Sequence, residues 1–249
     1  LRQPFGGTGK SALGPAIKAG GPNYVAQFMH FTETAPPRIE VIREENALLR
    51  LALEWRRKIM WGQMQPHAED VKKTIRAIQS YCFHWEQEFS AQKDYFHTRG
   101  QDNIHRYLPL GAIGIRLHEK DSLFDALARI AAARITENTA VVSIPEQLRN
   151  PVTDFLEKSD AHRLLGPSPV HRQSDEELIA AMEILERMRY AAPDRVPERV
   201  LQAAAAKGYY IARAPVLMEG RLELLHYVMN QSVCNNYHRY GNLGERAEL

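Results

Sequence analysis

The chain has 249 residues and a mass of 28.4 kDa; 44% of its residues are hydrophobic and 25% are charged. This composition is typical of a folded protein and excludes disorder as the dominant state. The length allows one to two domains with a sizeable core. Lys and Arg number 32 and Asp and Glu number 30, a net charge of +2. The overall charge therefore offers no case for binding nucleic acid or an anionic membrane.

Targeting signals and redox features are sparse. The sequence has no apolar run of about 18 residues, and its start lacks the basic-then-apolar layout of a signal peptide. We therefore expect no transmembrane segment and a cytoplasmic location. Two cysteines, Cys82 and Cys234, are too few for a disulfide framework or a metal cluster. The chain starts at Leu1 without a methionine, and we expect it to be cut from a longer polypeptide.

Composition changes along the first hundred residues. Residues 1–38 are rich in Gly and Pro, which indicates irregular backbone with one short helix or strand near residues 24–31. From about residue 41 to residue 90, apolar side chains recur every three to four residues on both sides of a break at residues 62–66. This predicts two helices in a hairpin, with Pro66 as an early helical position of the second. The apolar positions are Leu48, Leu51, Trp55 and Ile59, then Val71, Ile75, Ile78, Cys82, Trp85 and Phe89.

Residues 101–249 alternate strand and helix signals, which predicts an α/β structure with a largely parallel sheet. Ser174 and Glu177 have the spacing of a capping box at a helix start. The expected strands are residues 112–117, 139–144 and 209–213, and the expected helices are residues 122–135, 147–157, 175–190, 198–206 and 221–231.

A glycine-rich stretch at residues 6–11 resembles the end of a phosphate-binding loop. That loop needs a further glycine five residues before the Gly of Gly-Lys-Ser and a buried strand leading into it. This chain has Pro4 at the glycine position and no preceding strand signal. We therefore reject a nucleoside triphosphatase.

The same segment resembles another family more closely. Residues 3–7 (QPFGG), Ser11, residues 14–15 (GP) and residues 18–24 (KAGGPNY) resemble the carboxy-terminal end of the aldehyde dehydrogenase fold. The likeness is to the branch that oxidises L-glutamate γ-semialdehyde, the open form of Δ1-pyrroline-5-carboxylate, in proline catabolism. The resemblance implies that Phe5 packs on the aliphatic part of the substrate, which makes Phe5 the candidate substrate-binding residue. The alternative is that Phe5 only packs within a glycine-rich loop.

Motifs further along the chain extend the resemblance. Residues 100–103 (GQDN) with Tyr107 and Pro109, residues 215–216 (PV) and 220–225 (GRLELL), and residues 238–242 (HRYGN) resemble the extra carboxy-terminal domain of the bifunctional proline utilisation A family. In that family the domain is similar to a Rossmann-type aldehyde dehydrogenase half without its catalytic residues. The resemblance implies an architectural role, in which the domain covers the cavity between two active sites and takes part in intersubunit contacts of a homo-oligomer.

The expected fold class is therefore α/β, with a helical connector followed by a Rossmann-like, non-catalytic domain. Residues 1–38 would be the C-terminal segment of an aldehyde dehydrogenase catalytic domain, residues 39–100 the helical hairpin connector, and residues 101–249 the Rossmann-like domain. The resemblance implies that the full-length parent binds NAD, and FAD too if a proline dehydrogenase domain lies upstream.

The chemistry of an aldehyde dehydrogenase is missing from this chain. The reaction needs a cysteine thiolate, oxyanion donors, a general base and a nicotinamide. Cys82 lies in an apolar helical stripe, which favours a core position, and Cys234 lacks the family's surroundings for the nucleophile. Residues 117–122 (LHEKDS) carry charges where a dinucleotide needs glycines. We expect no catalytic residue, no cofactor in this segment and no activity from it alone.

The ten histidines are scattered along the sequence and do not predict a metal site. His238, Arg239 and Tyr240 are candidates for contacting the parent enzyme, with a solvated tail as the alternative. A second function class stays open, a free-standing α/β module that binds a ligand or a partner at the carboxyl ends of its strands.

Overall fold

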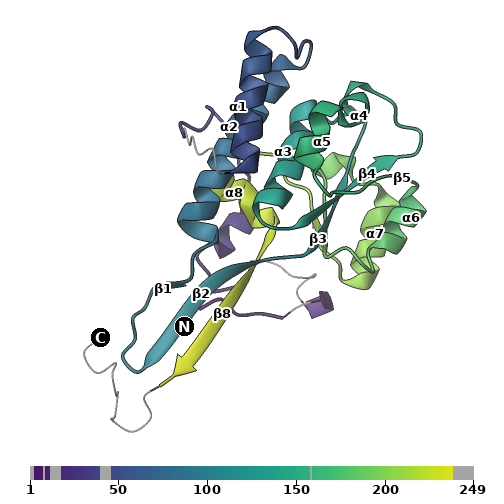
Figure 1. Ribbon diagram of the computed structural model, residues 1–249. Coiled ribbons are helices and arrows are strands. Elements are labelled where there is room, and N and C mark those ends of the chain that lie inside the picture. The colour runs from purple at the N-terminus through teal and green to yellow at the C-terminus, as the bar shows by residue number, and fades with distance from the viewer. Residues whose placement is uncertain (1–2, 8, 12–17, 40–45, 158, 238–249) are drawn as a thin grey trace.

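The computed structural model describes residues 3–7, 9–11, 18–39, 46–157 and 159–237. Figure 1 shows three parts of the fold: a helical hairpin, a parallel sheet with helices on both faces, and a long two-stranded ribbon that projects away from the sheet. The predicted contact surface at His238, Arg239 and Tyr240 lies outside the described residues.

The predicted helical hairpin is present. It consists of α1 (Ala47–Met60) and α2 (Ala68–His84), followed by a π-helical turn, η3 (Trp85–Phe89). Asn46 starts α1 because its side chain accepts hydrogen bonds from the amides of Leu48 and Leu49. The placement of Pro66 inside the second helix was wrong: α2 begins at Ala68, because the turn after α1 extends to the N-cap residue His67.

The α/β class with a largely parallel sheet is confirmed. The order β5-β4-β3-β6-β7, with the first strand of the sheet in its middle, is the arrangement of a Rossmann-type half. All its strand pairs are parallel. The five strands are β3 (Ala112–Arg116), β4 (Thr139–Pro145), β5 (Val170–Gln173), β6 (Arg187–Arg189) and β7 (Ile211–Ala212).

Helices cover both faces of this sheet (Figure 1). One face carries α3 (Leu123–Ile135), α4 (Pro151–Leu156) and α5 (Ser159–Leu165), whose apolar side chains share one core with the helical hairpin. The other face carries α6 (Asp175–Ala181) and α7 (Glu198–Lys207), which form a second, smaller core with β6 and β7. The capping box predicted at Ser174 and Glu177 is present, and Gly208, at φ 65°, ends α7 in the left-handed region.

Three predicted helices differ from the structure. The helix expected at residues 175–190 ends at Ala181, and β6 follows it, because two arginines in that strand hide the signal of a buried strand. The helix expected at residues 221–231 is a short α8 (Gly220–Glu223) with a 3₁₀ turn, η5 (Leu224–His226), after which the chain pairs as a strand. The helix expected at residues 147–157 begins only at Pro151, where Asn150 caps it.

The ribbon was not predicted. It pairs β2 (Gln101–Pro109) with β8 (Val228–Asn236) in antiparallel register, so that Gln101 lies opposite Asn236 and Pro109 opposite Val228. The short β1 (Lys93–Asp94) lies on the other edge of β2. Alternate residues of β2 are buried, which turns Asn103, His105 and Tyr107 towards the body of the protein.

Candidate functional site

Phe5 lies in a tight pairing of two glycine-rich segments. Its amide donates to the carbonyl of Ala19 at 2.8 Å, and the two residues form an isolated antiparallel bridge. Gly20, at φ 76°, permits this approach, because a Cβ there would meet the Gln3 carbonyl at 2.7 Å. The Phe5 ring itself is 63% exposed. The structure therefore presents the candidate substrate contact on the surface and does not bury it in the loop. Further along, the expected short element near residue 24 is a 3₁₀ helix, η2 (Tyr24–Phe28).

A polar junction ties the strip, defined here as residues 18–39, to the rest of the molecule. Asn23 is 3% exposed. Its side-chain nitrogen Nδ2 donates to the Tyr107 hydroxyl, and its side-chain oxygen Oδ1 accepts from Arg221 at 2.6 Å. Arg221 also pairs with Glu88 at 2.5 Å and lies over the ring of Phe89. Burial raises the pKa of Tyr107, so its hydroxyl stays protonated as a hydrogen-bonding group. The junction thus joins three motifs that are far apart in the sequence.

A second contact holds the far end of the strip. The Glu33 carboxylate accepts from the amide of Glu219 at 2.8 Å, and the Glu219 carboxylate pairs with His84 at 2.8 Å. Burial raises the pKa of Glu33, whereas the hydrogen bond from His84 lowers the pKa of Glu219. The pKa values of Glu33 and Glu219 are therefore displaced from the ordinary value in opposite directions.

Beneath α8 lies a fully buried ion pair. The Glu223 carboxylate accepts from Arg189 at 2.9 and 3.0 Å, from the Tyr227 hydroxyl at 3.0 Å and from the Leu217 amide at 3.1 Å. Arg189 also donates to the Ala214 carbonyl at 2.6 Å. Neither charged side chain is exposed. Glu223, from the GRLELL motif of residues 220–225, therefore fastens the interior of the α/β domain.

The carboxyl edge of the parallel sheet is where a dinucleotide binds in folds of this order. Here Arg116, at the end of β3, pairs with Asp175 at 2.6 Å. Arg129 pairs with the buried Asp121, which also accepts from Arg195 at 2.7 Å. The arginines and carboxylates thus satisfy one another at this edge.

Backbone amides at the start of α3 are already hydrogen-bonded within the protein. The Asp125 amide donates to the Ser122 hydroxyl at 3.0 Å, and the Ser122 amide donates to the Asp125 carboxylate at 3.0 Å. The Leu123 amide donates to the Asp70 carboxylate of α2 at 3.1 Å. A pyrophosphate needs these amides and no nearby negative charge. The residues present do not fit a bound dinucleotide, and the signal in the sequence was the LHEKDS segment at residues 117–122.

The two cysteines occupy different environments. Cys82 is 1% exposed in the core, as predicted, and burial raises the pKa of its thiol to about 12. A thiol with that pKa supplies almost no thiolate near neutral pH. Cys234 is exposed on β8. Among the described residues, no three side chains of His, Cys, Asp or Glu gather closely enough to hold a metal ion.

No protein-family model matches the sequence, and no curated protein matches it either. Solved structures do match. Proline Utilization A (PutA) from Corynebacterium freiburgense is 26% identical, with a TM-score of 0.60, over 96% of this chain and 19% of that one.

Aldehyde dehydrogenases match a smaller part of the chain. A lactaldehyde dehydrogenase is 19% identical, with a TM-score of 0.50, over 66% of this chain and 37% of that one. Glyceraldehyde-3-phosphate dehydrogenase GapN from Methanocaldococcus jannaschii, in complex with NADP, is 17% identical, with a TM-score of 0.50, over 67% of this chain and 40% of that one.

The chain has an aldehyde dehydrogenase fold. The similarity to PutA covers nearly the whole of this chain, whereas the similarity to the aldehyde dehydrogenases covers about two thirds of it. The chain spans about a fifth of the length of PutA and about two fifths of the length of the aldehyde dehydrogenases. No helix in the described residues has both the length and the apolar character needed to cross a bilayer.

The sequence predicts a substrate contact for Phe5, which stays a prediction, and it contains the motifs of the junction, but it did not identify Asn23, Arg221 or Asp70 as the residues that connect the parts. Each of these three acts through a partner more than 50 residues away. Periodicity and capping patterns carry no information over such separations.

Proposed function

We propose that the chain is the carboxy-terminal segment of an NAD-dependent L-glutamate γ-semialdehyde dehydrogenase within a bifunctional proline utilisation polypeptide, and that the segment itself is architectural. Residues 1–38 would complete the catalytic domain, residues 39–100 would connect, and residues 101–249 would cover the cavity between active sites and contribute to intersubunit contacts. The parent would act in the cytoplasm as a homo-oligomer, with FAD as a further cofactor if it carries a proline dehydrogenase domain.

One observation carries the proposal. The strip and the loop before it leave four large apolar side chains in solvent, namely Phe5 (63% exposed), Val25 (67%), Phe28 (70%) and Met29 (54%). The same strip is fastened to the rest of the molecule through Asn23 and Glu33. Exposed apolar groups gathered on one short segment are typical of a surface that another part of a protein covers. We take the covering partner to be an upstream catalytic domain, which the similarity to the much longer PutA supports.

The closed carboxyl edge of the sheet supports the non-catalytic part of the proposal. NAD would be bound by the upstream catalytic domain, which would also supply the cysteine nucleophile. In that assembly, the Phe5 ring would pack on the aliphatic part of the semialdehyde. Titration of this chain with NAD should therefore show no binding tighter than about 100 μM; tighter binding would favour a free-standing ligand-binding module.

The direct test is the coding sequence upstream of Leu1. An aldehyde dehydrogenase domain with a catalytic cysteine in the same reading frame would support the proposal, whereas a start codon just before Leu1 would contradict it. In the full-length polypeptide, deletion from Gln101 onwards should then impair assembly, stability or transfer between the two activities. Full coupled activity with unaltered assembly would remove the architectural role.

A further inference from the structure

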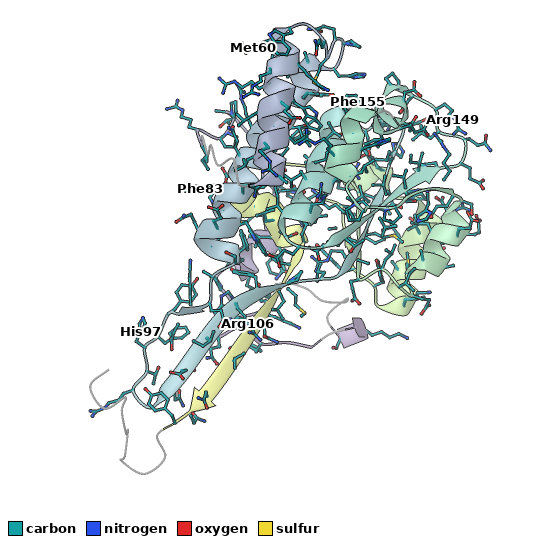
Figure 2. The ribbon with its side chains drawn as sticks, in the orientation of Figure 1. Met60, Phe83, His97, Arg106, Arg149 and Phe155 are labelled. Carbon is teal, nitrogen blue, oxygen red and sulfur yellow. The ribbon has the colours of Figure 1, made fainter. Side chains whose placement is uncertain are left out.

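A cavity separate from the polar junction opens beside the helical hairpin. It has a volume of about 760 Å³ and lies between residues 35–39, α1 and α2. Small-molecule sites commonly measure roughly 300–1,000 Å³. Met60, labelled at the tip of the hairpin in Figure 2, is one of the lining residues. The cavity is therefore large enough for a small organic molecule.

The charged side chains that line this cavity are all basic among the residues that the structure describes. They are Arg38 from the strip, Arg56 from α1, and Lys72 and Arg76 from α2. Glu69 lies outside the lining and pairs with Lys72 at 2.6 Å, and this hydrogen bond lowers the pKa of Glu69. The attraction for an anion therefore comes mainly from the three arginines.

The positive charge of the chain is concentrated here. Residues 50–76 hold seven Lys and Arg against three Asp and Glu, a local net charge of +4, whereas the whole chain carries +2. A concave surface with one sign of charge focuses the electrostatic potential and raises the local concentration of counter-ions. The hairpin thus attracts anions although the overall composition does not suggest it.

The same walls also carry apolar surface. On α1, Arg56 is followed at helical spacing by Ile59 and Met60, and on α2, Lys72 is followed at helical spacing by Ile75 and Arg76. Ile75 is 8% exposed, which places it deep in the wall. Each helix therefore presents an apolar and a cationic group on one face. A ligand that used both would need an anionic group attached to an apolar body.

We propose that this cavity binds a small organic phosphate, with the phosphate held by Arg56 and Arg76 and the apolar body packed against Ile59, Met60 and Ile75. A phosphate monoester carries close to two negative charges near neutral pH and accepts paired hydrogen bonds from guanidinium groups. A free metabolite and a lipid headgroup share this chemistry. The site is independent of the proposed architectural function, because it uses none of the junction residues.

The test is calorimetric titration of the full chain with three probes. Phenyl phosphate carries both parts of the proposed ligand, inorganic phosphate only the anion, and benzyl alcohol only the apolar part. We expect phenyl phosphate to bind with a Kd below about 1 mM and at least about tenfold more tightly than either partial probe. Phosphatidylcholine vesicles with and without phosphatidic acid, added as competitors, distinguish a lipid source from a soluble one.

The variant pair R56Q/R76Q has a matched control in R57Q/K73Q. The control removes the same two charges from neighbouring exposed positions of the same helices, outside the cavity lining. The cavity variant should weaken phenyl phosphate binding by about tenfold or more, and the control by less than about threefold. The thermal transition of each variant, followed by circular dichroism, checks that it is folded.

Three results would overturn the proposal. They are equal weakening in both variant pairs, equal affinity for phenyl and inorganic phosphate, and no binding of phenyl phosphate at about 1 mM. If R56Q/R76Q fails to fold, M60A replaces it, since Met60 is 75% exposed. M60A should weaken phenyl phosphate and leave inorganic phosphate unchanged; an unchanged phenyl phosphate affinity would then contradict the site.

Discussion

The strip and the carboxyl edge of the parallel sheet are two surfaces of opposite character. The strip leaves apolar rings and chains such as Phe28 and Val25 in solvent. The sheet edge pairs its charges internally, as Arg116 does with Asp175 and Arg129 with Asp121. In an aldehyde dehydrogenase fold the sheet edge is the place for a ligand, yet here its charged side chains pair with one another, and the strip is the surface with large exposed apolar groups. This difference is the basis of our proposal that another domain covers the segment and that the segment itself does not bind a dinucleotide.

The largest loss of stability should come from breaking the buried ion pair between Glu223 and Arg189. Glu223→Gln removes the charge that compensates Arg189, and both side chains are fully buried. Breaking such a pair from one side costs about 3–5 kcal/mol, because the remaining charge stays buried without its partner. The measurement is the free energy of unfolding in urea.

Glu157→Gln is the matched control, since Glu157 pairs with Arg172 at 2.6 Å but is 53% exposed. Exposed pairs contribute about 0–1 kcal/mol. Similar losses in the two variants would mean that the buried pair has no special role in the stability of the α/β domain.

A smaller effect should follow from loosening the strip. Asn23→Ala leaves the Tyr107 hydroxyl and the Arg221 guanidinium without one partner each. Unpaired buried polar groups cost roughly 1–3 kcal/mol each, and partial access of water reduces this to about 2 kcal/mol in total. Urea unfolding measures the loss, and limited proteolysis should cut the strip faster than in the parent. Asn235→Ala, an exposed asparagine on the ribbon, should change neither result, and protease resistance of the Asn23 variant would show that the junction does not hold the strip.

How well the sequence predicts these structural features depends on how far apart the interacting residues lie along the chain. Local patterns predicted the hairpin and the start of α6 at Ser174, because periodicity and capping are properties of neighbouring residues. They failed at β6, where Arg187 and Arg189 are buried against distant partners, and at β8, which pairs with a strand more than 100 residues earlier. The exposed position of Phe5 follows from the bridge to Ala19, which the glycines permit but do not specify.

Phe5→Ala tests whether the exposed surface reaches the substrate. In the full-length polypeptide, loss of a partly buried aromatic contact should lower kcat/KM for the semialdehyde by about tenfold. Phe28→Ala is the control, because Phe28 lies on the same exposed surface and carries no predicted substrate contact. If both variants raise KM equally, Phe5 acts only in packing against the catalytic domain.

The smallest effect is a pH dependence at the far end of the strip. The pKa of Glu219 is lowered by the hydrogen bond from His84, so its contribution to stability is present above pH 4.5 and is lost as the pH falls through the lowered pKa. The pKa of Glu33 is raised by burial, so its effect is reversed: stability is greatest below pH 4.5 and declines as the pH rises through the raised pKa.

The variants Glu219→Gln and Glu33→Gln should therefore change the slope of stability against pH in opposite directions. Glu219→Gln should remove part of the loss in acid, and Glu33→Gln should remove part of the decline above pH 4.5, each by less than about 1 kcal/mol because both groups are partly solvated. Thermal unfolding between about pH 3 and pH 7 measures both slopes. Slopes that changed in the same direction would mean that the pKa values of Glu33 and Glu219 are displaced in the same direction, which would contradict either the effect of burial on Glu33 or the effect of the His84 hydrogen bond on Glu219.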